Sequence, residues 1–357
     1  MKKIIAACLS VLLLACLAAG CGTAQASPSA AAEASAQTPG LPPQGGSFPH
    51  GEGGQTPFDN TGTSDGVSSE SENPAQTITE DGTYTITGDV NGQILVTAKT
   101  VTLILDGANI NCADGSAILG YYDDGKQSLT VELRGENTVS GAAHGIQGKD
   151  ELTITGSGFA GISAVKDGLH GGNLLTIAGG NVTVTSSYEG IEAPEIVFSG
   201  GNTVIHASDD GVNAATDDTS IAPSITITGG TLTIFSGSDG IDSNGTLSVT
   251  GGTTAIFVNA PRDGDTTDTE RGGTVKMPML YVSASVKSGA KISVGDWSVT
   301  AQSDATAFCL ILPGISEGQT YQVMADGALL TEATATVTLQ GMMMGGGGGG
   351  NGGGKRT

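Results

Sequence analysis

A repeated pair of signals limits the folds open to this chain more than any other feature. The first signal is a glycine doublet after a short apolar segment, at Gly179-Gly180, Gly200-Gly201, Gly229-Gly230 and Gly251-Gly252. The second is an acidic residue before glycine, at Asp167-Gly168, Glu189-Gly190, Asp210-Gly211 and Asp239-Gly240. Each of the first three doublets begins eleven residues before the glycine of the next acid-glycine pair. The two signals therefore belong to one repeating unit.

Apolar and polar residues alternate on both sides of the doublets, as in Leu175, Ile177, Val182 and Val184. This period of two predicts half-buried strands instead of helices. The acid-glycine corners recur about every 22 residues, which fits one coil of a β-solenoid, whereas a propeller blade needs about 40 to 45. We predict an all-β fold, a parallel β-helix over residues 76–260, with its glycines adopting positive φ at the corners.

The remaining sequence divides into four segments. Residues 1–20 resemble a lipoprotein signal peptide, because two lysines precede a short apolar run and small residues precede Cys21, the predicted lipidation site. Cys16 is a second candidate, and an ordinary secretory signal is the alternative. Residues 21–75 are predicted to be a flexible tether, 261–340 a C-terminal β capping unit, and 341–357 a disordered Gly-rich tail. We expect an extracytoplasmic protein, lipid-anchored to the cell membrane.

Charge and cysteine content exclude several classes of partner and chemistry. The formal net charge of −22 makes nucleic acid and anionic membrane surfaces poor partners, so we expect membrane contact only through the lipid anchor. Of the five cysteines, three lie in or directly after the signal segment, which leaves no disulfide framework. Cys112 and Cys309 are predicted to be buried apolar residues. We expect a monomer.

The acidic corners predict a metal site. Equivalent positions of successive coils should stack about 4.8 Å apart. That places Asp167, Glu189, Asp210 and Asp239 in one column, which we call the corner column. The residues two positions after each corner glycine form the strand column: His170, Glu192, Asn213 and Asp242. Asp209 adds a carboxylate, and an insertion after Asn213 adds Asp217 and Asp218.

Neighbouring carboxylates at this spacing repel by roughly 3 kcal/mol at an effective dielectric near 20, which a cation would relieve. Calcium prefers oxygen ligands, so we predict calcium bound by a set drawn from ten residues: Asp167, Glu189, Glu192, Asp209, Asp210, Asn213, Asp217, Asp218, Asp239 and Asp242. The alternative is that Asp-Gly is turn chemistry with solvated carboxylates. Zinc at His170 or His206 is not favoured, because no second spaced histidine joins either one. We interpret both as surface histidines.

Three segments carry a family resemblance: residues 187–193, 207–214 and 238–245. They resemble the bacterial carbohydrate-binding parallel β-helix lipoproteins related to pectate lyases, over roughly Gln76 to Val258. The resemblance implies a right-handed parallel β-helix, bound calcium, and affinity for cellulose or acidic polysaccharides. Tyr188 is a candidate for stacking on a sugar ring, with ordinary packing as the alternative.

Three functions remain open on the sequence. The favoured one is calcium-dependent, cell-surface binding of plant-type or acidic polysaccharides such as cellulose and pectin-like uronans, without catalysis. The second is a calcium-dependent pectate lyase, in which Lys166 or Arg271 would remove a proton from the uronate. Basic residues are sparse, which disfavours it. The third is a non-catalytic structural envelope protein with calcium in a purely structural role.

Overall fold

The computed structural model describes residues 68–259, 266–268 and 273–338. The signal segment, most of the tether and the Gly-rich tail lie outside these ranges. The described residues form strands and turns and contain no helix. They therefore include no helix long and apolar enough to cross a membrane. The predicted all-β class and parallel pairing are confirmed.

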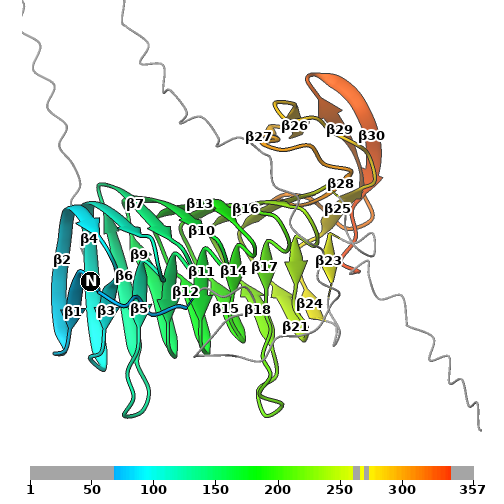
Figure 1. Ribbon diagram of the computed structural model, residues 1–357. Helices are drawn as coiled ribbons and strands as arrows, with labels where there is room; N and C mark the ends of the chain where they lie inside the picture. The colour runs from blue at the N-terminus through cyan, green and yellow to red at the C-terminus, as the bar shows by residue number, and fades with distance from the viewer. Residues whose placement is uncertain (1–67, 260–265, 269–272, 339–357) are drawn as a thin grey trace, which may run out of the picture. The chain divides into compact units, whose positions relative to one another are not determined.

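Nine short strands form one wholly parallel sheet, in which strands neighbouring in space come from successive repeat units (Figure 1). In order they are β1 (Gln76–Ile78), β3 (Ile94–Val96), β5 (Ile118–Gly120), β8 (Ile146–Gly148), β11 (Leu169–Gly171), β14 (Ile191–Glu192), β17 (Val212–Asn213), β20 (Ile241–Asp242) and β23 (Thr267–Asp268). We call this the narrow sheet. Its strands carry the strand column at their second residue.

A larger sheet contains two further parallel ladders. The first consists of β2 (Gly82–Asn91), β4 (Thr100–Cys112), β6 (Ser128–Arg134), β9 (Glu151–Gly156), β12 (Leu174–Ile177), β15 (Glu195–Phe198), β18 (Ser224–Ile227), β21 (Thr246–Val249) and β24 (Gly273–Val275). The second branches from β4 through β7 (Glu136–Gly141), β10 (Phe159–Ala164), β13 (Asn181–Ser187), β16 (Asn202–Ala207), β19 (Thr231–Ser236) and β22 (Thr253–Val258).

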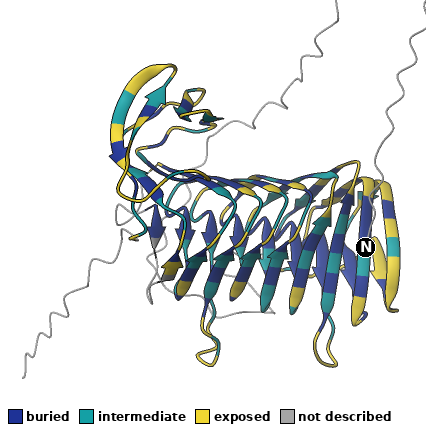
Figure 2. Cartoon of the chain, turned by 180° about the vertical axis from the view of Figure 1, so that it is seen from behind, coloured by how far each residue is buried: buried dark blue, intermediate teal, exposed yellow. Residues whose placement is uncertain are grey.

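Most buried apolar residues of the three ladders form one core, whereas Phe235 of β19 and Ala255 and Phe257 of β22 belong to a second cluster with the C-terminal strands. The members of the larger core recur once per unit in register, as in Leu175, Ile196 and Ile225 of the first ladder of the larger sheet, all fully buried. Figure 2 shows buried strand segments repeated along the ladders and exposed residues at the loop tips. Cys112 and Cys309 are free and buried, as predicted.

The end of the parallel ladders is covered by antiparallel strands. β28 (Ala307–Ile311) pairs with β22 on one side and β25 (Met279–Val282) on the other. A separate sheet is built from β26 (Lys291–Val294), β27 (Trp297–Thr300), β29 (Thr320–Ala325) and β30 (Ala328–Thr334). Parallel pairing continues to Val275, beyond the predicted boundary at residue 260, because β23 and β24 add to their ladders.

The glycines serve two different purposes, which corrects the prediction of positive φ at every corner. The second glycine of each doublet does have positive φ, for example +82° at Gly180. The acid-glycine corners do not. A Cβ at Gly168 would lie 2.6 Å from Val184 Cγ1 and 2.8 Å from the carbonyl oxygen of Gly190. Glycine is needed there because the neighbouring unit leaves no room for a side chain.

Candidate functional site: the acidic columns

The corner column exists as predicted. Backbone hydrogen bonds join each corner to the next: Gly168 N–H donates to Glu189 C=O, Gly190 N–H to Asp210 C=O, and Gly211 N–H to Asp239 C=O. The same pattern extends one unit earlier, where Gly145 N–H donates to Asp167 C=O and so places His144 at the head of the column. His144 was missed because its corner carries an imidazole instead of a carboxylate, although His144-Gly145 occupies the position of the acid-glycine pair.

The strand column is also in register along the narrow sheet. His170 pairs with Glu192, Glu192 with Asn213, and Asn213 with Asp242. The two columns are neighbours because each corner residue precedes its strand-column residue by three positions. This spacing brings the oxygens of Asp167, Glu189 and Glu192 within 4.8 Å of one another.

Burial makes the carboxylates at the centre of the site costly to ionise. Glu189 is 9 % exposed, and burial together with the charges of Glu192 and Asp167 raises its pKa well above the ordinary value. Burial and the charge of Asp167 also raise the pKa of Glu192. Asp210 is less enclosed, and burial followed by the charge of Asp209 raises its pKa to about 7. Burial therefore disfavours the charged forms of Glu189, Glu192 and Asp210 unless a proton or a cation neutralises them.

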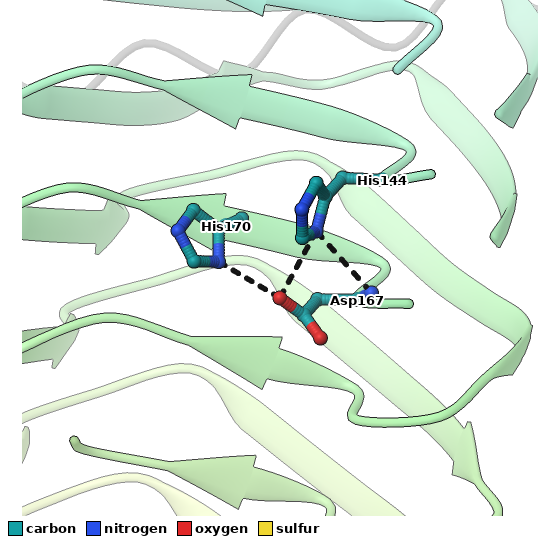
Figure 3. Close-up of side chains that lie close together, drawn as sticks. All are labelled: His144, Asp167 and His170. Atoms are coloured by element: carbon teal, nitrogen blue, oxygen red, sulfur yellow. Dashed lines mark hydrogen bonds and ion pairs between the residues drawn. The ribbon is translucent and has the colours of Figure 1, made fainter. Parts of the chain in front are cut away.

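Asp167 behaves differently because two histidines face it. Its Oδ2 lies 3.0 Å from His144 Nδ1 and 2.8 Å from His170 Nδ1 (Figure 3). Burial alone would raise the pKa of Asp167, but the charges and hydrogen bonds of the two histidines outweigh it and lower the pKa. The interpretation of His170 as a surface histidine is wrong, because its side chain is only 12 % exposed. His206 instead contacts Gln302 Oε1 at 2.9 Å.

One buried atom indicates that the carboxylate cluster fits a hard cation. Glu189 Oε2 is buried and receives no hydrogen bond from an N–H or hydroxyl group of the described residues, while Glu189 Oε1 accepts one from Asn213 Nδ2 at 3.0 Å. The carboxyls of Glu189 and Glu192 can hydrogen-bond to each other only through a shared proton. A buried acceptor without a donor is costly. Asp167, Glu189 and Glu192 supply the oxygen ligands that calcium prefers, and Asp210 and Asp239 stack directly beyond Glu189.

The other predicted ligands lie at the margin or have different contacts. Asn213 Oδ1 accepts from Asn244 Nδ2, and Asp242 Oδ1 accepts from Asn244 N–H, both at 3.0 Å. Asp217 is exposed, yet its charge still raises the pKa of Glu192. Asp218 is exposed and accepts both the N–H and the hydroxyl of Ser220, which closes a local turn away from the cluster.

Tyr188 presents its ring beside the corner column. Its side chain is 54 % exposed, and its backbone N–H donates to Lys166 C=O in the preceding unit. Asp209 in the next unit donates its backbone N–H to Tyr188 C=O, and a hydrogen bond to the Asp209 carboxylate raises the pKa of the phenol. Asp209 thus orients Tyr188. Of the two lysine and arginine candidates, Lys166 is half-buried beside the column and Arg271 lies outside the described residues.

Two loops border a second surface feature. The loops after β5 and β17 extend beyond the strands (Figure 1), and Lys126 of the first and Ile221 of the second line the same cavity of about 350 Å³. Asp150, Asn173 and Glu195 form its floor on successive units, and Asn173 Nδ2 donates to Asp150 Oδ1 at 2.9 Å.

Comparison with known proteins gives a family match over most of the chain. A family model described as carbohydrate-binding domain-containing protein matches residues 72–328. No curated protein matches. Among solved structures, the chain is similar to a polysaccharide lyase-like protein from C. thermocellum, solved as a gadolinium derivative, with 26 % identity and a TM-score of 0.45. The similarity covers 56 % of this chain and 84 % of that one.

Proposed function

Because this chain belongs to the carbohydrate-binding domain-containing proteins, we propose that it binds plant-type or acidic polysaccharides, such as cellulose and pectin-like uronans, in a calcium-dependent manner. The observation that carries the calcium part is the buried Glu189 Oε2, which lacks a hydrogen-bond donor among three converging carboxylates. Calcium, when bound, would neutralise these carboxylates and offer free coordination positions to a uronate. An acidic protein could then bind an acidic sugar without net repulsion.

The proposed sugar site combines this cluster with Tyr188. An exposed aromatic ring offers an apolar face to a sugar ring, and the Asp209 contact restricts its orientation. Asp167, Glu189 and Glu192 would hold the cation, with Asp210, Asp239 and Asp242 extending the acidic surface along successive units. A regular spacing of acidic groups suits a repeating polymer better than a small molecule.

The sense of winding and the location of the protein complete the proposal. Connections between parallel strands of one sheet are overwhelmingly right-handed, so the three parallel ladders support a right-handed β-helix. The small residues before Cys21 support lipid anchoring to the cell membrane and an extracytoplasmic location. A monomer is the simplest state of such a surface protein.

The test is binding of the full chain to insoluble cellulose and to polygalacturonate, in calcium and in chelator. We expect calcium-dependent retention on at least one of them, and about a fivefold or greater loss for Tyr188→Ala, since stacked rings contribute about 1 kcal/mol. Leu329→Ala is the matched control, because Leu329 is equally exposed on the C-terminal sheet. Absence of retention on both polymers in calcium would refute the proposal.

A lyase activity is the second candidate, and one observation favours it. Lys166 lies close enough to the site that its charge opposes protonation of both His144 and His170, although Asp167 raises the pKa of His170 overall. A base beside a calcium-bound uronate is the arrangement that β-elimination needs. Incubation with polygalacturonate and calcium should then release an unsaturated product that absorbs in the ultraviolet. If the ultraviolet absorbance does not rise at any pH, glycan binding without catalysis is the remaining function.

A further inference from the structure

The head of the corner column differs chemically from the rest. His144, Asp167 and His170 come from two successive units, and their ligand atoms lie within 4.8 Å of one another. The three side chains are 7 to 12 % exposed, and the imidazole rings are 4.6 Å apart between centroids. Figure 3 shows both rings turned toward the carboxylate. From Glu189 and Glu192 onward, the described members of the two columns carry only carboxylate or amide groups.

We propose that His144, Asp167 and His170 bind a zinc ion or a similar first-row transition metal. Zinc binds imidazole nitrogen and carboxylate oxygen at about 2.0 to 2.2 Å in tetrahedral geometry, so two ligand atoms of one ion lie roughly 3.3 to 3.6 Å apart. The Nδ1–Oδ2 separations of 3.0 and 2.8 Å are shorter than this, so the side chains would move apart by about half an ångström to admit the ion. Glu192, paired in register with His170, is the fourth donor we assign.

Protons cannot satisfy every contact of His144. Its Nδ1 lies 3.0 Å from Asp167 Oδ2, which requires a proton on the nitrogen. The same Nδ1 lies 3.4 Å from the backbone nitrogen of Asp167, whose N–H requires a lone pair there. One nitrogen cannot be donor and acceptor at once, so one of the two contacts is lost in any tautomer. A metal ion bound to the lone pairs of both Nδ1 atoms and to Oδ2 would replace the two imidazole–carboxylate hydrogen bonds.

The two ends of the columns would therefore select different ions. Imidazole favours zinc and other transition metals, whereas carboxylate oxygens alone favour calcium. Asp167 belongs to both clusters and would link the two sites. The zinc proposal does not require glycan binding, although its ligands Asp167 and Glu192 also belong to the proposed calcium site.

The test is titration of the metal-stripped full chain with zinc chloride in saturating calcium, followed by calorimetry. We expect one zinc per chain that calcium does not displace. His170→Gln should weaken it by at least about tenfold to 100-fold, since even outer partners of zinc ligands have effects of this size. Glutamine is compatible with the strand column because Gln147 pairs with His170 one unit earlier. His206→Gln is the control and should leave the affinity unchanged.

Cobalt provides a second readout on the unsubstituted chain, which does not depend on a variant that folds. Bound Co²⁺ should give visible absorption bands of a nitrogen and oxygen site, and these bands should persist in excess calcium and disappear on addition of zinc. Failure of the unsubstituted chain to bind zinc or cobalt in calcium would overturn the proposal. So would an unchanged zinc affinity in folded His170→Gln.

Discussion

The buried carboxylate of Glu189 faces two others, which makes its ionisation costly. Glu189→Gln keeps the shape and the oxygen that accepts from Asn213, but removes the charge. We expect the metal-free protein to become more stable by about 1 kcal/mol, since a buried like-charge contact is lost. We also expect most of the calcium-induced rise in Tm to disappear.

Thermal unfolding with calcium and with chelator measures both effects. Glu195→Gln is the matched control, because Glu195 lies on β15 of the same unit and is exposed. An equal calcium-induced rise in Tm for Glu189→Gln and the unsubstituted protein would contradict the proposed calcium site.

Asp210 should make the stability of the metal-free protein depend on pH. Its pKa is raised to about 7 in the folded state, chiefly by burial and then by Asp209, against an ordinary value near 4. The folded state therefore holds this proton more tightly, and stability falls as pH rises from about 4 to about 7. Asp210→Asn should flatten that slope while keeping the oxygen that accepts from Asp239 N–H.

Urea unfolding in chelator across this pH range measures the slope. The charges of Asp209 and Asp242 raise the pKa of Asp210, so they act in the same direction. Asp124→Asn, on the exposed loop after β5, should leave the slope unchanged. A slope unaffected by Asp210→Asn would show that other groups determine it.

The residues of the site were predictable only where their chemistry repeats. Glu189, Asp210 and Asp239 share one motif at one interval, so the corner column followed from the sequence. His144 occupies the same position but breaks the motif, and its contact with His170 depends on packing between units. The contrast between enclosed Glu189 and exposed Asp218 also depends on packing, since both are acids in the repeat region.

Each acid-glycine corner depends on close contact between neighbouring units. Gly168→Ala would place a methyl group 2.6 Å from Val184 Cγ1 and 2.8 Å from the carbonyl oxygen of Gly190. Because the backbone cannot move without shifting the ladder, we expect a loss of at least about 2 kcal/mol in the free energy of unfolding. Gly161→Ala is the control, since its nearest atom would be Phe159 Cε1 at 3.4 Å. Urea unfolding should rank the two variants clearly.

The strands and their stacking followed from the sequence because the two-residue alternation and the 22-residue repeat can both be read from short stretches of the chain. Alternation around Leu175 and Ile177 indicates strands, and the interval near 22 residues indicates which strands pair. The two different roles of glycine did not follow from the sequence. Positive φ at Gly180 and steric exclusion at Gly168 look alike in a sequence, and only the position of Val184 distinguishes them.

The whole molecule depends on its C-terminal strands to close an otherwise open edge. β28 covers β22, and the rings of Phe308 and Phe257 stack with centroids 5.3 Å apart. Phe308 is fully buried, so Phe308→Ala should cost about 3 to 5 kcal/mol. It should also weaken the cover over β22 and expose an edge that pairs with other molecules. We therefore expect a lower Tm together with concentration-dependent oligomers in size-exclusion chromatography with light scattering.

Leu329→Ala, which removes an exposed apolar side chain from the same region, should change neither property. A Phe308→Ala protein that loses stability but stays monomeric at high concentration would show that β22 is protected by something other than the packing of β28.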